Sequence, residues 1–427
     1  MLVRRTWGPA AGVAVLSLAV ACGLPTATSA PAVTGAAVDP PTGAPPDDPP
    51  VERPAPDPTN VEALVAGLND VGYRIFAAAA GASPDDVVLS PLSIGLAFGM
   101  ADLGATGPTA DTLAALFAYP VDGEERWAAF NALEQAVVSD AGPIVRLANR
   151  QFPDVSFQPA PEYDERLQRW FGTGIEPLPL AADPDASRER INRWVAQRTE
   201  DRIPELLRDA PDAVMVLVNA LYLEADWLVP FGKYPTMIED FTRLDGSTVP
   251  VALMHELELL GPAVATDSYA ATEVPYEGKE LSMLVIVPED GHFADVQARL
   301  AEGLAAEIDA TATPAAVELY LPTFQSTATL DLREVLEGNL GVTDLFDVPG
   351  FAGIAPEVEL GSAVHAADLE VDEQGTVAAA ATALEFPTSG PPVPDLTVRA
   401  DRPFLYLIRH QPTGMVLFVG RVMDPAA

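Results

Sequence analysis

Residues 373–386 constrain the fold more than any other stretch of the chain. Alanine has the highest helix propensity, so the alanine run inside this stretch is compatible with a helix. At a period of two, however, every second residue from 376 to 386 forms one uncharged face that is small at first and then large and apolar. Such a segment can lie in the middle of a sheet, because nothing bulky or charged is forced into the interior. The local sequence leaves both the helix and the latent strand open.

Length and charge limit the classes of protein to be considered. With 427 residues, 48% of them hydrophobic and 20% charged, the chain is globular and long enough for one large or two ordinary domains. A formal net charge of -38 argues against a nucleic-acid partner, because phosphate binding needs Lys and Arg. The charge favours a soluble, self-repelling monomer, and an adaptation to salt explains it equally well.

Residues 1–21 are predicted to be an export signal. Arg4 and Arg5 precede a short apolar core, residues 10–20, that ends in small residues and is too short to span a bilayer comfortably. The single cysteine, Cys22, follows this core and resembles the acylated first residue of a bacterial lipoprotein, although Ala19 stands where such signals usually have Leu. The alternative is an ordinary secretory signal with an incidental cysteine. One cysteine also excludes an internal disulfide.

Residues 22–58 are predicted to be a tether. Proline recurs through this segment among Ala, Thr, Gly and Asp, a composition that builds no packed core. Apolar residues at helical spacing begin near Asn60, which with Thr59 is a candidate N-cap. Because no internal repeat or second linker follows, residues 59–427 are predicted to form one mixed α+β domain.

The strongest predicted strand covers residues 214–223 (VMVLVNALYL). It is apolar on both faces, as expected for the centre of a sheet. Asn219 lies in its middle, and a buried amide requires hydrogen-bond partners. Further predicted elements are helices at 94–103, 109–117, 162–171, 187–199 and 332–340, a hairpin at 271–290 and a strand at 317–324.

The sequence holds no recognisable catalytic constellation. Its four histidines form no HExxH motif, and no GxSxG, GxxxxGK[ST] or GxGxxG sequence is present. A single cysteine that is predicted to be lipidated excludes thiolate catalysis and zinc–cysteine sites. The chain is therefore predicted to be a binder or an inhibitor and not an enzyme, with no metal and no cofactor.

Six sequence blocks, in the expected order, resemble the serpin family from about residue 60 to the end. The blocks are residues 88–94 (VLSPLSI), 103–106 (LGAT), 218–223 (VNALYL), 363–376 (AVHAADLEVDEQGT), 401–408 (DRPFLYLI) and 417–425 (LFVGRVMDP). The resemblance implies an α+β serpin fold with three β-sheets, about eight or nine helices and an exposed reactive-centre loop, residues 373–398, that is able to insert into the main sheet.

The resemblance also implies an activity. Serpins offer the loop as a substrate to a serine protease, hold the protease as an acyl-enzyme and insert the cut loop as a new strand in the main sheet. The active fold is then metastable, and a kinetic barrier separates it from the more stable inserted form. Residues 373–386 are accordingly interpreted as a strand that forms after cleavage.

The hinge of that loop is identified by its match to the inhibitory pattern. The matching residues are Glu373, Gly375, Thr376, Ala378, Ala379, Ala380 and Ala381. Gly375 is expected to supply the unusual backbone conformation of the bend, and the small residues after it are expected to let the sheet open gradually. Val377 departs from the pattern, because an acidic residue is common there, but it lies on the outward face.

The family's usual spacing places the cleaved bond between Ser389 and Gly390, with Thr388–Ser389 as the rival. The loop is a few residues longer than usual, and the extra residues are expected after the cut. If they lie before it, the bond moves, and Leu384 or Phe386 would suit a chymotrypsin-like enzyme. A small uncharged residue at the cut suits elastase- or subtilisin-like pockets. The lack of a basic residue near it argues against a trypsin-like target.

Four residues match the family's "shutter", the polar cluster beneath the strands that must part: Ser90, Ser93, Asn219 and His365. A buried network of this kind is stable when it is fully paired and costly when it is half-paired. Trp227 matches the "breach", the aromatic site below the point of loop insertion.

The predicted function is irreversible inhibition of an extracytoplasmic serine protease of the elastase or subtilisin type. The alternatives are a non-inhibitory serpin that acts as a protease substrate or binding module, and a surface adhesion lipoprotein. The protein is expected to be exported and bacterial, extracellular or held on the outer face of the cytoplasmic membrane through Cys22 alone. Activation by a heparin-like polyanion is not expected at this charge.

Overall fold

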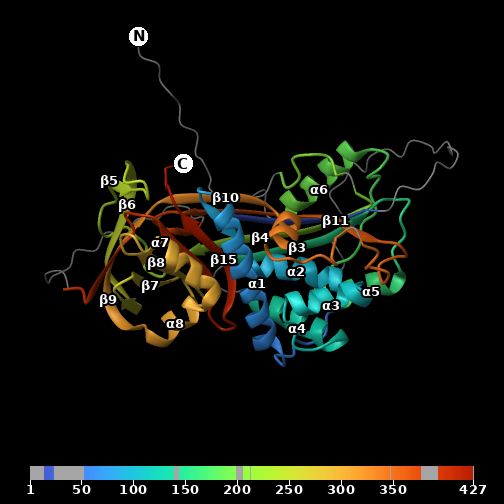
Figure 1. The fold of residues 1–427 in the computed structure, drawn as a ribbon, viewed down its shortest axis with the longest axis horizontal. Helices are drawn as coiled ribbons and strands as arrows, with labels where there is room; N and C mark the ends of the chain where they lie inside the picture. Colours follow the sequence, from blue (N-terminus) through green and yellow to red (C-terminus); the bar gives the residue numbers. More distant parts are fainter. Residues whose placement is uncertain are drawn as a thin grey trace, which may run out of the picture.

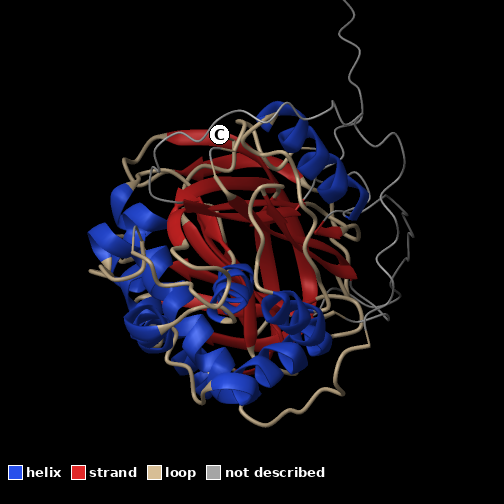
Figure 2. Cartoon of the chain, turned by 90° about the vertical axis from the view of Figure 1, so that its right-hand side faces the viewer, coloured by secondary structure: helices blue, strands red, loops and turns tan. Residues whose placement is uncertain are grey.

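The computed structural model describes residues 14–23, 52–138, 144–198, 205–211, 213–346, 348–376 and 393–426. The helices are α1 (Val61–Ala82), α2 (Pro91–Asp102), α3 (Gly107–Leu116), α4 (Gly123–Val137), α5 (Pro161–Phe171), α6 (Pro184–Arg198), α7 (Phe293–Arg299), the 3-10 helix η1 (Leu300–Glu302), α8 (Leu304–Thr311) and the π-helix η2 (Glu334–Asn339). The strands form two sheets, and Figure 2 shows them running through the centre of the molecule with helices around them.

The main sheet is six-stranded. Its strands are β1 (Ala14–Gly23), β3 (Ile144–Pro153), β4 (Met215–Asp226), β10 (Phe324–Asp331), β11 (Glu359–Val371) and β12 (Gly375–Thr376). As the apolar pattern predicts, β4 is central: it pairs with β3 on one side and with β1 and β12 on the other. Both β1 and β12 also pair with β11, so they share one space between β4 and β11 (Figure 1). We call this space the insertion slot.

The second sheet is nine-stranded. Its strands are β2 (Val87–Leu89), β5 (Met237–Thr242), β6 (Thr248–Ala265), β7 (Tyr269–Pro275), β8 (Leu281–Pro288), β9 (Thr313–Pro322), β13 (Leu396–Arg399), β14 (Phe404–His410) and β15 (Met415–Val422). The long strand β6 joins two parts, because β5 and β9 pair with most of its length and β7 pairs only with its last residues. With the main sheet, these two parts give the three-sheet α+β architecture that the resemblance implied.

Helix α2 supports the main sheet from below. Ser90 caps it by accepting a hydrogen bond from the Ser93 amide at 3.0 Å, and Pro91 occupies its first turn, where a missing N–H costs nothing. Every residue of α2 is buried, which explains its uniformly apolar sequence. A Cβ on Gly95 would lie 2.8 Å from a Leu68 methyl carbon, so glycine lets α1 and α2 approach closely.

Arg53 fixes the start of the continuous described chain. Its Nε donates to Asn131 Oδ1 at 2.8 Å, and its Nη2 donates to the Trp170 carbonyl at 2.8 Å and pairs with Glu134 at 3.2 Å. Arg53 thereby attaches the segment before α1 to α4 and the end of α5. Among the described residues, no helix combines the length and hydrophobicity that crossing a bilayer requires.

Several local predictions need correction. Asn60 adopts a left-handed conformation and its side chain caps no helix N–H, so α1 begins at Val61 without the predicted cap. The predicted helix at 332–340 is a short π-helix. The predicted helix at 94–103 begins three residues earlier, at Pro91. Helix α4 was not predicted, because charged residues interrupt its apolar spacing.

Candidate functional site

A tight turn brings the hinge into the main sheet. The Asp372 carboxylate accepts hydrogen bonds from the amides of Gln374 at 2.8 Å and Gly375 at 3.1 Å, and the Asp372 amide donates to the Gly375 carbonyl at 3.0 Å. An aspartate that bonds the amides two and three residues ahead is a common way of holding a turn. The chain therefore reverses after β11 and enters the insertion slot as β12.

Gly375 is needed for close approach and not for an unusual backbone angle. Its φ of 159° is close to extended. A Cβ at this position, however, would lie 2.1 Å from the Ala225 carbonyl oxygen and 2.8 Å from Asp226 Cα in β4. Any larger residue would clash with the β4 backbone, so close approach, and not the unusual backbone angle expected from the sequence, is what requires glycine here.

Thr376 is already buried in the insertion slot. It pairs with Ala225 of β4 and with Val371 of β11, and none of its surface is exposed. Its Oγ1 lies 2.8 Å from the Tyr276 hydroxyl, which is itself fully buried, so the two hydroxyls satisfy each other. Burial raises the pKa of Tyr276, which keeps the phenol protonated.

Trp227 forms the breach by packing and by hydrogen bonds. Its ring stacks on Tyr276 with centroids 4.4 Å apart and planes inclined by 11°. Its Nε1 donates to the Asp372 carbonyl at 3.0 Å, and its backbone amide donates to the Gln374 carbonyl at 2.7 Å. Trp227 thus supports the turn that carries the predicted hinge.

Glu373 connects the same turn to the segment after β4. Its carbonyl accepts from the Phe231 amide at 2.8 Å, and its carboxylate accepts from the Thr236 hydroxyl at 2.7 Å. The Phe231 ring meets Trp227 edge-on at 6.1 Å. The described hinge residues Glu373, Gly375 and Thr376 therefore contact one aromatic and hydrogen-bonded support.

The carboxylates around the hinge repel one another. Burial raises the pKa of Asp226, and the neighbouring charges of Glu277, Glu224 and Asp372 raise it further. Burial also raises the pKa of Glu370, with Asp372 adding to the effect. Negative charge is thus concentrated where the insertion slot opens.

The four predicted shutter residues lie near one another as two hydrogen-bonded pairs, which we call the two halves of the shutter. Ser93 Oγ donates to Asn219 Oδ1 on β4, and the Ser90 amide donates to His365 Nε2 on β11 at 3.1 Å. All four side chains are fully buried. The Ser90–Ser93 cap bond at the start of α2 links the halves. Burial lowers the pKa of His365 to about 3, so the ring is neutral at physiological pH.

The two halves are separated by one strand. Asn219 and His365 are both register partners of the same β1 residue, Leu18. His365 Nδ1 has no hydrogen-bond partner within the described chain. The sequence did not identify Asn149 of β3 as a shutter residue, although it accepts from Asn219 Nδ2 at 2.6 Å. A buried Asn219 requires a hydrogen-bond partner, and this requirement was the only sequence signal for Asn149. The sequence does not reveal which strand supplies that partner.

Part of the predicted site lies outside the described residues: Ala378, Ala379, Ala380, Ala381, Thr388, Ser389 and Gly390. The described chain resumes at Val393, which is 89% exposed. It then runs parallel to β9 as β13. The loop therefore joins the main sheet at Thr376 to the second sheet at Leu396. Cys22 is described in β1, opposite Met215 and Leu360.

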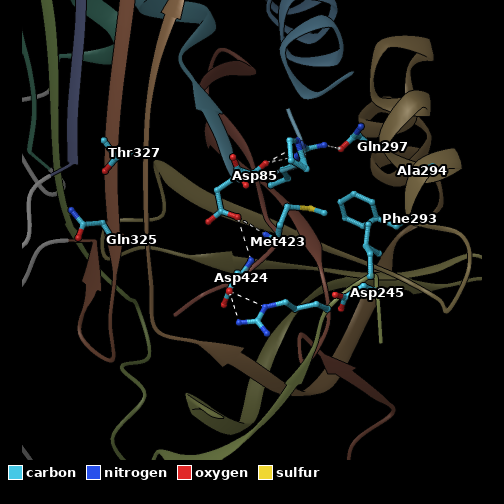
Figure 3. Close-up of a pocket in the computed structure, with 14 residues that line it drawn as sticks. Asp85, Asp245, Phe293, Ala294, Gln297, Gln325, Thr327, Met423 and Asp424 are labelled. Atoms are coloured by element: carbon cyan, nitrogen blue, oxygen red, sulfur yellow. Dashed lines mark hydrogen bonds and ion pairs between the residues drawn. The ribbon is translucent and has the colours of Figure 1, made fainter. Parts of the chain in front are cut away.

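A cavity of about 850 Å³ lies away from the hinge, beside the start of β2 and the end of β15 (Figure 3). Arg243 pairs with Asp424 at 2.6 Å, and Asp86 accepts from the Met423 amide at 2.5 Å. Burial raises the pKa of Asp86 to about 6. None of the described hinge and shutter residues lines this cavity. Within the described ranges, no group of three acidic, histidine or cysteine side chains is placed to hold a metal ion.

Comparison with known proteins identifies the architecture. The sequence matches the family model described as serpin (serine protease inhibitor) over residues 66–425. It is 32% identical over 370 residues to an uncharacterized serpin-like protein of Thermococcus kodakarensis, covering 85% of this chain and 86% of the relative. It is also 32% identical over 358 residues to the leukocyte elastase inhibitor of Bos taurus, covering 80% of this chain and 93% of the relative.

The fold agrees with solved structures of the same architecture. The native state of tengpin, a thermophilic serpin, matches with a TM-score of 0.76 at 22% identity, covering 88% of this chain and 97% of that chain. Family members are inhibitors that act on serine proteases and are not themselves enzymes. With the family model matched over residues 66–425, which is most of this chain, the chain belongs to the serpin family.

Proposed function

We propose that this serpin is a suicide-substrate inhibitor of an extracytoplasmic serine protease with an elastase- or subtilisin-like specificity pocket. The observation that carries the proposal is the position of the hinge. Gly375 and Thr376 already pair with β4 and β11, and the residues that follow are alanines that a sheet can admit. Once the predicted export cleavage removes residues 1–21, which include most of β1, a cut loop has this strand position to extend into.

The chemistry requires only the loop and the sheet of the inhibitor. The protease serine attacks the Ser389 carbonyl, the peptide bond to Gly390 breaks, and the Gly390 amine leaves with the proton that the protease histidine supplies. Ser389 then remains esterified to the protease. If the loop continues β12 as a strand, the fourteen residues after Gly375 carry Ser389 about 45 Å along the main sheet. A displacement of that size is larger than the radius of a small protease and distorts its active site before water hydrolyses the ester.

Insertion also supplies the driving force. Each added residue of a central strand contributes backbone hydrogen bonds to two neighbours, at roughly 1 kcal/mol net per bond. A strand of about ten residues is therefore worth on the order of 10 kcal/mol, enough to make the reaction irreversible. The predicted shutter supports such an exchange, because Asn219 and His365 each keep a serine partner at the start of α2 while a strand lies between them.

The proposed specificity follows from the uncharged, small residues around the predicted bond. Ser389 would occupy a shallow apolar pocket, and the rival bond places Thr388 there instead. A trypsin-like pocket carries an aspartate that needs Arg or Lys, and residues 375–398 contain neither.

The test is a mixing experiment with the chain that begins at Cys22, the predicted mature protein. Pancreatic elastase and subtilisin are expected to form a covalent complex that survives SDS, with an accompanying rise in the melting temperature of the cleaved inhibitor. Trypsin is the matched control and is expected to form none. Cleavage without complex by every protease would replace this proposal with the substrate or binding-module alternative, and no cleavage at all would favour the adhesion alternative.

The proposed location is the cell exterior, with the domain carried on the tether of residues 22–58 and lipidated at Cys22 in the manner of a bacterial lipoprotein. The apolar core before Cys22 and the proline-rich segment after it support this. Incorporation of labelled palmitate into the wild type but not into Cys22→Ser tests the anchor. Equal labelling of both, or of neither, would overturn it in favour of an ordinary secretory signal.

A further inference from the structure

Strand β1 occupies the place that the reactive loop needs. It lies antiparallel to β4 from Ala14–Leu223 to Cys22–Met215, and antiparallel to β11 over the same length. It therefore lies in the insertion slot, next to β12 along the length of β4.

The register of β1 coincides with that of an inserted loop. Gly375 is opposite Asp226 and Thr376 is opposite Ala225. Continued residue by residue, this antiparallel register brings residue 378 opposite Leu223 and residue 386 opposite Met215. Those two β4 residues are the partners of Ala14 and Cys22. Against β4, each position that residues 378–386 would take is thus already taken by residues 14–22, whereas the pairing with β11 shifts by one residue between Ala21 and Cys22.

The two segments are interchangeable in chemistry as well as in register. The β1 sequence AVLSLAVACG has no charge and no residue larger than leucine. Residues 378–386 (AAAATALEF) are likewise small and apolar except at Glu385. Because a strand edge offers one set of N–H and C=O groups, occupation of the slot by one segment excludes the other.

We propose that residues 14–23 are an intramolecular occupant of the insertion slot, which hold the uncut chain in a form that a protease can cleave but that cannot trap it. This inference rests on the proposed function, because it concerns the slot through which the inhibitor acts. A cut between Ala21 and Cys22, the predicted signal cleavage, removes all but the last two residues of β1. Processing on export then vacates the slot and switches the inhibitor on.

The chain is long enough for this arrangement. The roughly 30 residues between Gly23 and Arg53 reach about 90 Å when extended, which is ample for a connection from the end of β1 to the Arg53 site on α4 and α5. Arg53 remains attached through its bonds to Asn131, Glu134 and the Trp170 carbonyl. Occupation and release of the slot therefore need no rearrangement of the folded domain.

The experiment uses the full chain, produced without export so that residues 1–23 are retained. Leu18→Pro removes a ladder N–H at the centre of β1 and is incompatible with a central strand. Leu24→Pro is the matched control, since residue 24 follows the last residue of β1. The first readout is binding of a labelled synthetic peptide of residues 377–386, which does not depend on inhibition of any protease. Leu18→Pro is expected to bind at least tenfold more peptide than the wild type or Leu24→Pro.

Amide hydrogen exchange is the second readout. The amides of residues 15–22 are expected to be protected in the wild type and in Leu24→Pro, and to exchange freely in Leu18→Pro. Equal peptide uptake by all three proteins, or rapid exchange of residues 15–22 in the wild type, would overturn the inference. If Leu18→Pro does not fold, Leu18→Asp and its control Leu24→Asp take its place. Position 18 lies opposite the fully buried Asn219 and His365, where a carboxylate is costly.

A protease assay on the same proteins separates this inference from the proposed function. With elastase or subtilisin, Leu18→Pro is expected to form covalent complex, whereas the wild type and Leu24→Pro are cleaved without it. If no protein forms complex but peptide binding and exchange behave as expected, the occupied slot is supported and the inhibitory function is refuted. If the wild type and Leu18→Pro form complex equally, the function is supported and the inference is refuted.

Discussion

The hydroxyl groups of Tyr276 and Thr376 lie 2.8 Å apart inside the main sheet, with both side chains fully buried. Thr376 is the last described residue before the gap at residues 377–392, so this contact holds the end of the described hinge in the main sheet. Because each hydroxyl is the partner of the other, the pair is sensitive to the loss of either one.

Tyr276→Phe and Thr376→Val are each expected to lower the free energy of unfolding by about 1 to 2 kcal/mol, since each leaves one buried hydroxyl without a partner. The double variant is expected to cost less than the two single changes together. Urea unfolding of the four proteins measures this coupling. Additive costs would show that the hydroxyls are satisfied elsewhere.

Gly375→Ala is expected to displace β12 from β4, because the new Cβ would lie 2.1 Å from the Ala225 carbonyl oxygen. We expect a loss of about 1 to 3 kcal/mol in the free energy of unfolding and a larger share of cleavage without complex. Gly81→Ala is the control, because a Cβ there meets no atom within 4 Å. A Gly375→Ala protein as stable as Gly81→Ala would contradict the close-approach explanation.

Thr376→Arg is expected to turn the inhibitor into a substrate. The position is fully buried beside Tyr276, and an unpaired guanidinium is costly to bury there. With the predicted mature chain, the yield of covalent complex should fall at least tenfold while cleavage continues. Thr397→Arg makes the same change on the exposed side of β13 and should leave the yield unchanged. An unchanged yield in Thr376→Arg would refute insertion at this residue.

His365 is expected to make the protein less stable in acid. Burial lowers its pKa to about 3, whereas an unfolded histidine titrates near 6.5. Between these values the unfolded chain binds a proton that the folded chain does not, so stability is lost as the pH falls from about 6.5 toward 3, by up to about 4 to 5 kcal/mol. His365→Gln keeps an acceptor for the Ser90 amide and lacks this titration. Parallel unfolding curves for the two proteins from pH 7 to 4 would contradict the prediction.

Asp86 is expected to have the opposite effect. Burial raises its pKa to about 6, so from about pH 4 to 6 the folded chain holds a proton that the unfolded chain has lost. Stability therefore falls as the pH rises through this window, by up to about 3 kcal/mol. Asp86→Asn should gain stability relative to the wild type over the same interval, while Asp85→Asn, which alters an exposed neighbour, should not. A difference in the free energy of unfolding between Asp86→Asn and the wild type that does not change with pH over this window would contradict the prediction.

The sequence predicted the parts of the site that depend on local pattern. The apolar strand around Asn219 and the turn into α2 at Ser90 lie where their patterns placed them, whereas the hinge role of Gly375 stays a prediction. Residues that contribute through the approach of distant strands were not predicted. Tyr276 lies in an ordinary hairpin by its sequence, and it meets Thr376 only because β7 and the end of β4 converge.

The sequence pattern also did not predict that β1 lies in the main sheet. An apolar run before a cysteine predicts an export signal, and the same run satisfies the requirements of a central strand, because both need an uncharged segment of small and aliphatic residues. Only the register against Asn219 and His365 distinguishes the two. One segment can serve both purposes until processing removes it.

The Arg53 contacts have a geometric consequence for a domain held by its N-terminus. They attach the segment before α1 beside α4 and α5. The described chain resumes after the loop at β13, which pairs with β9. Helix α5 and strand β9 lie toward opposite ends of the long axis (Figure 1). If the proposed attachment at Cys22 holds the domain through this segment, the end of the domain that carries β13 faces away from the point of attachment.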